Sequence, residues 1–364
     1  MSAGVSVADV ESFHFEGVEI APGTGVEVSL ELGAGPAGNP RSIPVYVLHG
    51  TKPGPVLGLV AGIHGDELNG VSVVHHLIHG DDHIANTDDD TINRKQLSGT
   101  LICVPVVNIE GMLLEQRGAP DNRDINRLFP GKRDGNQSQR IAFALFQGVV
   151  NRADYLIDLH SAPHSRTNLP HVRADFDKSD CLDLARAFGT QIILHSNGPK
   201  GSLRREASKK GTPTILLEAG TAHRFEMEAV HSGIEGVLNV MGHLGMINRK
   251  NRQPAVRLLV RRSKWARAEA GGLLYSLVKA GDHVEKGQKI ALITDPLGAK
   301  THTVESPRTG VIVGLAINPL VRAGDPIANI VLCSAAKWRR SQVEPDAEDP
   351  EEESVDDEES VDEA

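Results

Sequence analysis

The chain has 364 residues, 40% of them hydrophobic, which is enough for a large core and predicts one large domain with a smaller one beside it. It contains no run of about 18 apolar residues and no basic start followed by an apolar stretch, so no membrane span or targeting signal is expected and a cytoplasmic location is predicted. Aromatic residues make up only 4% and basic runs are short, which argues against a nucleic-acid partner.

The cysteine content and the distribution of charge further narrow the class of protein. The three scattered cysteines form no CxxC pair, which fits a reducing compartment and argues against a cysteine-based metal site. Residues 344–364 hold 13 of the 48 acids and no Lys or Arg, leaving 35 acids against 38 bases elsewhere. We expect 339–364 to be a disordered acidic tail that aids solubility or contacts a basic partner or the protein's own basic surface.

Residues 1–42 are expected to be a lead-in segment, and residues 43–250 alternate short apolar strands with helical patterns. Apolar positions recur at helical spacing in 138–150 and 226–245. Several strands are apolar on both faces, which predicts an α/β sheet with helices on both sides. The predicted strands are 45–50, 56–63, 101–108, 154–161, 191–196 and 213–220.

The pattern changes near residue 250, where NRKNRQP reads as a linker. Residues 251–338 contain short β-like runs, many glycines and an internal echo, VKAGDHVEKGQKIALI against LVRAGDPIANI. This region resembles the biotinyl/lipoyl-like sandwich, and a small all-β domain is predicted. Lys300 is not expected to be a modified carrier lysine, because no methionine precedes it at the hairpin TDPLGAKT.

The segment GIHGDELNG, residues 62–70, follows an apolar strand and places His64 three residues before Glu67. If the strand ends at Gly62 and a helix opens near Asp66, this step directs both side chains toward one point. Gly62 and Gly65 then permit a sharp turn at the carboxyl edge of the sheet, where open α/β folds bind ligands. Alone, the pair fits a polar turn as well as it fits half of a metal site.

Two further strands end in candidate catalytic side chains. His160 closes the run YLIDLH, and Asp158 lies on the same side of the extended strand, where its carboxylate can orient the imidazole. Glu218 ends PTILLEAG at the same sheet edge, placed to accept a proton from a metal-activated water. Two histidines and a glutamate are an established ligand set for catalytic zinc. The structural alternatives are a buried core histidine and an acid in a surface ion pair.

Positive charge gathers in EQRGAPDNRDINRLFPG, which contains Arg117, Arg123, Asn126 and Arg127. Arginine offers a rigid two-pronged donor to a carboxylate, and donors aimed at a developing oxyanion stabilise a transition state. The segment is therefore a candidate for binding an acidic substrate, although any one of its arginines fits a surface ion pair equally well.

Together these segments resemble the succinylglutamate desuccinylase/aspartoacylase family, relatives of the zinc carboxypeptidases, over about residues 45–335. The family's marks stand in order as GIHGDELNG, VVNIEGM, RDINRLFPG, DLHS and LLEAG. The resemblance implies a mixed α/β sheet of the zinc carboxypeptidase type and one zinc ion per subunit. It implies that the zinc ligands are His64, Glu67 and His160.

The resemblance also implies roles for the neighbouring side chains. Glu218 is the general base, and Asn126 with Arg127 binds the substrate carboxylate. Arg117 polarises the scissile carbonyl, with Arg123 as the alternative.

Departures from the family limit what is implied about the substrate. No tyrosine lies in 161–217, where characterised aspartoacylases close the substrate pocket. That interval instead offers Arg166, Asn168 and Arg204 or Arg205 as candidates, and a solvated basic loop is the alternative. N-acetylaspartate and N-succinylglutamate are therefore not carried over.

The leading hypothesis is a zinc-dependent amide hydrolase, acting on bonds other than ordinary peptide bonds, that removes the acyl group from an N-acylated, carboxylate-bearing amino acid or similar small molecule. A carboxypeptidase-like enzyme trimming an acidic C-terminal residue is the second hypothesis. A non-catalytic binding module is the third. A homo-oligomer is compatible with all three.

Overall fold

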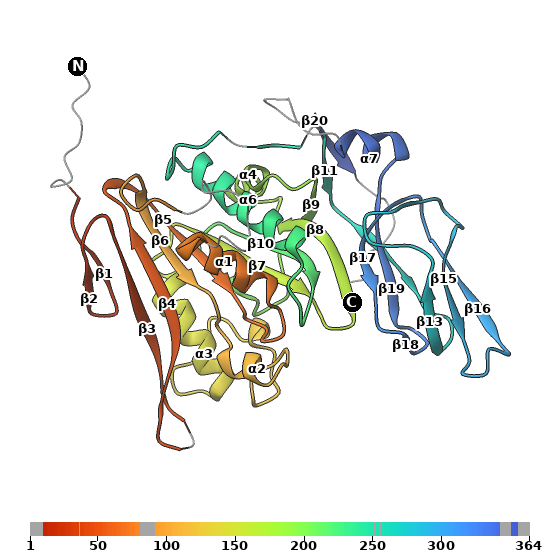
Figure 1. The fold of residues 1–364 in the computed structure, drawn as a ribbon, viewed down its shortest axis with the longest axis horizontal. Helices are drawn as coiled ribbons and strands as arrows, with labels where there is room; N and C mark the ends of the chain where they lie inside the picture. Colours follow the sequence, from red (N-terminus) through yellow and green to blue (C-terminus); the bar gives the residue numbers. More distant parts are fainter. Residues whose placement is uncertain are drawn as a thin grey trace.

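The computed structural model describes residues 10–35, 37–80, 92–250, 252–254, 256–342 and 351–355. One large sheet runs through the molecule in the order β12-β19-β17-β8-β10-β7-β5-β6-β4-β3, with β9, β11, β14 and β20 attached as branches (Figure 1). The strands up to residue 250 are β1 (Phe13–Phe15), β2 (Val18–Ile20), β3 (Thr24–Ala34), β4 (Pro40–His49), β5 (Lys52–Ala61), β6 (Ser98–Val104), β7 (Tyr155–Ala162), β8 (Arg166–Ala174), β9 (Ile192–His195) and β10 (Thr214–Thr221). The helices are α1 (Asn69–His79), α2 (Ile109–Leu113), α3 (Gln137–Leu145), α4 (Ser179–Phe188), α5 (Leu203–Lys210), α6 (Met227–His243) and α7 (Ala335–Ser341), with a 3₁₀ turn at Ile125–Arg127 and a π turn at Phe146–Val150.

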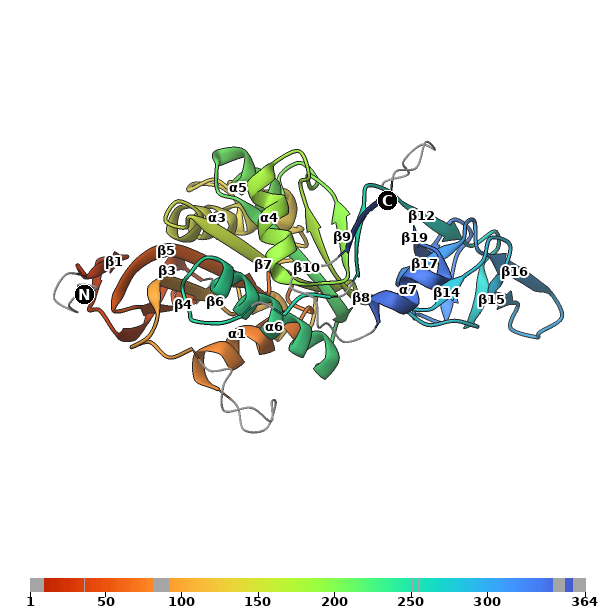
Figure 2. The ribbon, with the colours of Figure 1, turned by 90° about the horizontal axis from the view of Figure 1, so that it is seen from above.

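The centre of the sheet is parallel and apolar on both faces. Strands β6, β5, β7 and β10 run parallel, whereas β3 and β4 pair antiparallel with their neighbours. Strand β8 pairs antiparallel with β10 and β17 and parallel with β9. On β7, Ile157 and Leu159 join a core with α1, α4 and α6, while Leu156 joins a second core with α3 and α5. Figure 2 shows α1 and α6 on one side of the sheet and α3 and α5 on the other. The predicted mixed α/β sheet with helices on both faces is confirmed.

The C-terminal region is all-β apart from α7, and two sheets enclose its core. Its strands are β11 (Val256–Val260), β12 (Ser263–Arg267), β13 (Gly272–Ser276), β14 (His283–Val284), β15 (Lys289–Thr294), β16 (Thr301–Glu305), β17 (Gly310–Ala316), β18 (Leu320–Val321) and β19 (Pro326–Leu332). The sheet β16-β15-β13-β18 shares its core with β12, β19 and β17, through residues such as Leu274, Ile290 and Ile330. The likeness to a biotinyl/lipoyl sandwich stays a prediction.

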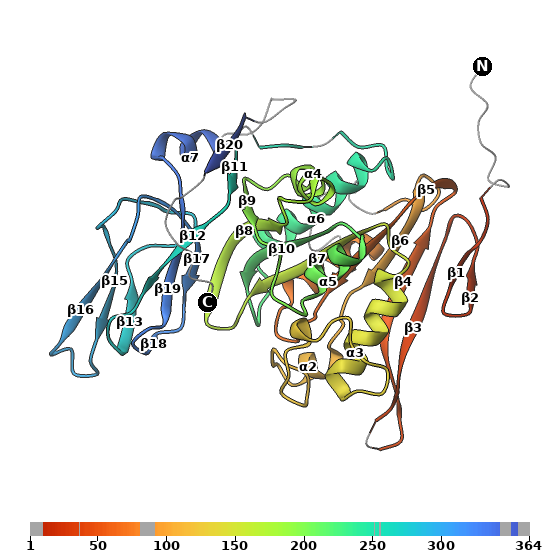
Figure 3. The same ribbon diagram turned by 180° about the vertical axis from the view of Figure 1, so that it is seen from behind.

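The C-terminal region is joined to the rest of the molecule through backbone pairing. Strand β17 pairs antiparallel with β8, where Gly314 lies opposite Asn168, and β11 pairs parallel with β9. The large sheet therefore passes from the α/β body into the C-terminal region, as the view from behind also shows (Figure 3).

The acidic C-terminal segment differs from its prediction. Residues 339–341 belong to α7, and β20 (Glu351–Val355) pairs parallel with β11. Both parts are ordered elements, so the expected disorder is wrong for them. Within β20, Glu352 accepts hydrogen bonds from Arg186 and Arg257. Residues 343–350 and 356–364 lie outside the described residues.

Several strands lie where the sequence predicted none, among them β3 and β8. The 11-residue β3 lies within the segment expected to be a lead-in, and it pairs with β4 at one edge of the large sheet. Strand β8 lies within 161–217, and it is inserted between β10 and β17.

Among the described residues, no helix is long and apolar enough to cross a membrane.

Candidate metal centre

The turn after β5 brings His64 and Glu67 together. Strand β5 ends at Ala61, and Gly62 adopts a φ of +60°, a left-handed conformation that glycine takes without strain. The Glu67 backbone N–H donates to the His64 carbonyl at 3.2 Å, which closes the turn. The predicted helix start near Asp66 is wrong, because α1 begins at Asn69; a tight turn produces the predicted approach instead.

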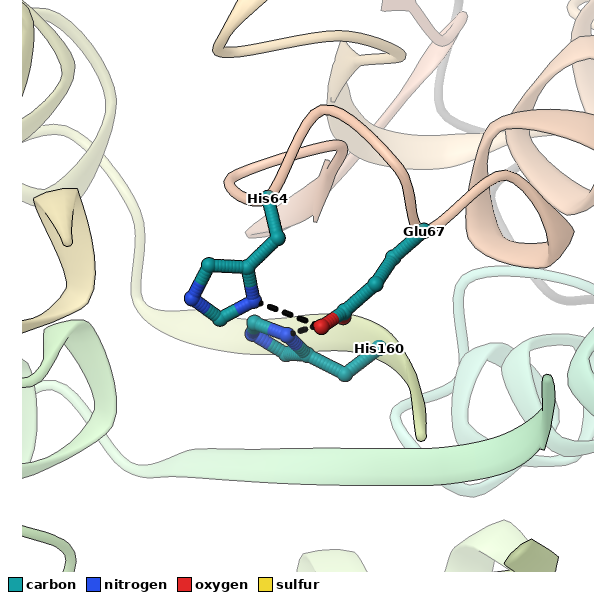
Figure 4. Close-up of side chains that lie close together, drawn as sticks. All are labelled: His64, Glu67 and His160. Atoms are coloured by element: carbon teal, nitrogen blue, oxygen red, sulfur yellow. Dashed lines mark hydrogen bonds and ion pairs between the residues drawn. The ribbon is translucent and has the colours of Figure 1, made fainter. Parts of the chain in front are cut away.

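Three buried side chains converge from this turn and from β7. The Nδ1 atom of His64 lies 2.8 Å from Glu67 Oε1, and the Nδ1 atom of His160 lies 2.8 Å from Glu67 Oε2. Figure 4 shows both imidazoles turned toward the one carboxylate. All three residues are less than 5% exposed, so solvent does not separate them. The structure therefore brings together the three predicted metal ligands.

Each imidazole has an aspartate behind it. His64 Nε2 lies 3.1 Å from Asp124 Oδ1, and His160 Nε2 lies 3.0 Å from Asp158 Oδ1. A carboxylate on the second ring nitrogen fixes the tautomer and ring orientation of a metal-binding histidine. The predicted Asp158–His160 pairing is confirmed, and Asp124 performs the same task for His64.

The charged groups of the cluster stabilise one another's ionised forms. Burial alone lowers the pKa of His64 and His160, but Glu67 with the aspartates behind the rings outweighs burial and raises both pKa values. Burial alone raises the pKa of Glu67, yet the two histidines hold that pKa well below its usual range. Without a metal, the cluster is thus an ion-paired group that retains protons a cation would displace.

The donor set fits a metal ion. Ligand atoms of His64, Glu67 and His160 all lie within 4.8 Å of one another. His64 Nδ1 is buried, lies 2.8 Å from Glu67 Oε1 and makes no hydrogen bond among the described residues. Two imidazoles and a carboxylate with an open fourth position are typical of catalytic zinc. These three side chains could therefore hold a zinc ion.

Glu218 stands beside His160 on the neighbouring strand. In the parallel pairing of β10 with β7, Glu218 lies directly opposite His160. Its Oε2 accepts a hydrogen bond from Asn168 Nδ2 at 3.0 Å, and its Oε1 lies 3.8 Å from Arg173 Nε. The side chain is 18% exposed, so the predicted base is partly accessible at the sheet edge that carries the histidine.

The structure distinguishes the two candidate arginines. Arg117 donates to Glu67 Oε1 at 2.8 Å and to Asp124 Oδ2 at 3.3 Å, which places its guanidinium against the cluster. Arg123 is 57% exposed and pairs with Asp121 at 3.7 Å. Arg117 is thus the arginine that adjoins the candidate ligands.

Asn126 and Arg127 lie on the 3₁₀ turn beside the cluster. Asn126 is buried; its Oδ1 accepts from the Leu203 backbone at 2.8 Å, and its Nδ2 lies 3.5 Å from His160 Nε2. Arg127 is 48% exposed and donates to the Asn126 carbonyl. One side chain is fixed and the other is partly free, so together they offer an anchored amide and a reachable guanidinium.

The remaining candidates occupy different surroundings. Arg166 begins β8, and its guanidinium stacks 4.9 Å from the Trp265 ring of the C-terminal region. Arg204 is 4% exposed and donates to Ser196, and burial together with the nearby Arg173 lowers the pKa of Arg204 to about 10. Arg205 donates to the Gly198 carbonyl. Arg166 therefore lies at the junction of the two regions, whereas Arg204 is enclosed.

Sequence reasoning did not assign two charged neighbours of the site. Asp124 stands inside the motif RDINRLFPG, two residues before Asn126, and that position was its only signal. Arg173 lies on β8, opposite Leu216 of β10, and could be placed beside Glu218 only once β8 was known to be a strand.

Comparison with known proteins agrees with this geometry. The model of the succinylglutamate desuccinylase/aspartoacylase catalytic domain matches residues 53–244, more than half of the chain. The chain belongs to this family. The resemblance inferred from the five motifs is confirmed.

Relatives of this family member extend the likeness over most of the chain. The N-alpha-acetyl-L-2,4-diaminobutyric acid deacetylase of Halomonas elongata is 27% identical over 302 residues, which cover 79% of this chain and 85% of that protein. The product-bound ectoine utilization protein EutE (DoeB) of Ruegeria pomeroyi aligns with a TM-score of 0.75 at 22% identity, covering 85% of this chain and 95% of the other. A succinylglutamate desuccinylase/aspartoacylase of Rhodobacter sphaeroides aligns with a TM-score of 0.73 at 24% identity and the same coverage. These structures share the fold of this family member.

Proposed function

We propose that the protein is a zinc-dependent deacylase that hydrolyses the amide bond of a small N-acylated, carboxylate-bearing amino acid. The observation that carries the proposal is the convergence of two buried imidazoles on one buried carboxylate, with an acid behind each ring. In a purely structural ion pair, each charged group needs only one partner of opposite charge. A set with three ligand atoms around one point is the arrangement that a metal requires.

In this proposal His64, Glu67 and His160 hold one zinc ion per subunit. When bound, zinc would polarise the substrate carbonyl and lower the pKa of a water molecule to about 7. Asp124 and Asp158 would hold the Nε2 protons of the two histidines and fix the ring orientation, so that the Nδ1 atoms are the ones to bind the metal. Glu218, in register with His160, accepts the water proton and returns it to the leaving amine.

The positively charged residues position the substrate and stabilise developing charge. Arg117 adjoins Glu67 and is proposed to donate to the carbonyl oxygen as negative charge develops there. Asn126 Nδ2 and the partly exposed Arg127 are proposed to bind the substrate carboxylate. Arg166 is proposed as a further contact to the substrate, because it lies where the C-terminal region meets β8. Arg204 is the weakest of these candidates for substrate binding, because its guanidinium already donates a hydrogen bond to Ser196.

An N-acetylated amino acid is the first acyl substrate to test. The Halomonas elongata relative removes acetyl from Nα-acetyl-L-2,4-diaminobutyric acid, as its name states, and it covers most of this chain. The C-terminal strand β17 pairs with β8 at Asn168, the hydrogen-bond partner of Glu218, so the C-terminal region adjoins the candidate site.

The test is a deacylation screen with purified protein, measured with and without added zinc. Substrates are Nα-acetyl-L-2,4-diaminobutyric acid, N-acetylaspartate, N-succinylglutamate and glutamate-terminated peptides. We expect one small N-acyl amino acid to be hydrolysed, chelator to abolish the rate and zinc to restore it. Glu218→Gln should lower kcat at least about 100-fold, because the general base is lost while the ligands remain.

Three results distinguish the hypotheses. Release of a C-terminal residue from the peptides alone would favour the carboxypeptidase. Zinc bound without any hydrolysis would favour the binding module. Purified protein without zinc, or full activity in Glu218→Gln, would refute the proposed mechanism.

A further inference from the structure

The residue that contacts Glu218 lies between the two halves of the molecule. Asn168, on β8, is paired through its backbone with Gly220 of β10 on one side and with Gly314 of β17 on the other. Its side chain reaches toward β10, where Nδ2 donates to Glu218 Oε2 at 3.0 Å. Asn168 therefore contacts Glu218 through its side chain and the C-terminal region through its backbone pairing.

The hydrogen bond gives Glu218 a direction that its other contact does not. Arg173 Nε lies 3.8 Å from Oε1, beyond hydrogen-bonding distance, so it attracts the carboxylate without fixing its rotation. A carboxylate only accepts hydrogen bonds, so the NH₂ side of the Asn168 amide must face Glu218. A bond to an ionised acceptor is roughly twice as strong as one between neutral groups. Asn168 therefore fixes one carboxylate oxygen and leaves the other free of hydrogen bonds among the described residues.

The C-terminal region contributes the space that Asn168 needs. A Cβ atom on Gly314 would lie 2.9 Å from Asn168 Oδ1, closer than atoms normally approach. The next atoms, Asn329 Cβ and the Trp265 ring, would lie at the ordinary distances of 3.5 and 3.7 Å. Alanine at position 314 would therefore displace the Asn168 side chain and little else.

We propose that Asn168 is a positioning residue for Glu218, and that Gly314 in the C-terminal region keeps Asn168 in place. The proposal rests on the proposed role of Glu218 as the general base. It assigns the C-terminal region a part in the reaction, because a change there alters the orientation of a group on β10.

The direct test compares Asn168→Asp and Asn168→Ala with the wild-type protein on the substrate found in the screen. Asp has the size of Asn but cannot donate from a charged carboxylate, so it removes the hydrogen bond and adds repulsion. We expect kcat to fall about tenfold or more in both variants, as the loss of a hydrogen bond to a charged group predicts. KM should change less than about twofold and zinc content not at all.

The second test changes only the C-terminal region. Gly314→Ala should reproduce the fall in kcat, and adding Gly314→Ala to Asn168→Ala should cause no further fall, because both act through one contact. Gly271→Ala is the matched control in the same region. The Cβ atom added there would meet its nearest neighbour at 3.3 Å and lies away from Asn168, so the activity should stay unchanged.

The outcomes separate this proposal from the proposed function. If wild-type protein is active and Glu218→Gln is not, wild-type kcat in Asn168→Ala overturns the positioning role, as would equal loss in Gly271→Ala and Gly314→Ala. If wild-type protein hydrolyses no N-acyl compound, the proposed function fails. Crystal structures of wild-type and Gly314→Ala protein then decide: an unchanged Glu218 side chain overturns the proposal, and a reoriented one supports it.

Discussion

Asp124 sets the positions of three candidate site residues. One oxygen accepts from the Asn126 backbone at 2.8 Å and contacts His64 Nε2, while the other accepts from Arg117. Burial alone would raise the pKa of Asp124, but His64, Arg117 and Arg127 together hold that pKa far below its usual value. The carboxylate therefore resists protonation.

Asp124→Asn should weaken zinc binding about 10- to 100-fold, because the amide no longer orients and charges the His64 ring as the carboxylate does. The measurement is competition for zinc with a fluorescent chelator. Asp121→Asn is the control, since Asp121 lies on the same loop but contacts Ser138 and Arg123. Equal zinc affinity in Asp124→Asn and wild-type protein would show that the pairing with His64 is incidental.

At the scale of elements, the apolar strands β7 and β10 were easier to predict than the polar strand β8. Strands β7 and β10 were predicted to within one residue, because apolar runs lead up to His160 and Glu218, and both strands continue to Ala162 and Thr221. Strand β8, RTNLPHVRA, was missed because polar and charged residues interrupt it. The neighbouring strands β10 and β17 satisfy the backbone hydrogen bonds of β8, so β8 does not need an apolar sequence to form a strand.

The acidic segment forms strand β20 because arginines of the folded protein pair with it. Arg257 is 3% exposed, and Glu352 accepts from it at 2.9 Å and from Arg186 at 2.7 Å. Burial lowers the pKa of Arg257 and Glu352 opposes that change. A strand that composition alone predicts to be disordered can thus be held by its pairing with β11 and by these charges.

Glu352→Arg should release the acidic segment and destabilise the protein by about 1–3 kcal/mol, because a buried arginine loses its charged partner. The measurements are the rate of proteolytic removal of the segment and the free energy of unfolding in urea. Glu305→Arg, an exposed reversal on β16, should change neither. The double variant Glu352→Arg with Arg186→Glu should regain part of the loss; no regain would exclude this ion pair as the attachment.

At the scale of the whole molecule, one buried histidine on β8 links stability to pH. His171 is 1% exposed, lies opposite Glu218 in the sheet, and donates from Nδ1 to the Leu169 carbonyl at 2.8 Å. Burial and then Arg173 lower the pKa of His171 to about 3. The unfolded chain, with a histidine pKa near 6.5, binds this proton far more readily than the folded protein.

The free energy of unfolding should therefore fall as the pH drops from about 6.5 toward 3, by up to about 1.4 kcal/mol per pH unit from this residue. Above pH 6.5 the residue contributes no pH dependence. His171→Leu should flatten the dependence relative to wild type in urea unfolding at a series of pH values. His302→Leu, exposed on β16, should not. Parallel curves for wild type and His171→Leu would contradict the prediction.

The sequence alone determined the α/β class and the identity of His64, Glu67, His160 and Glu218 as candidates. These follow from local patterns: apolar runs with period and length, and polar residues where the runs stop. Only the tertiary structure decided which arginine faces the cluster, that Asp124 backs His64, and that Asn168 joins Glu218 to Gly314. These depend on strands and loops far apart in the chain meeting in register, and no local pattern records which segments will become neighbours.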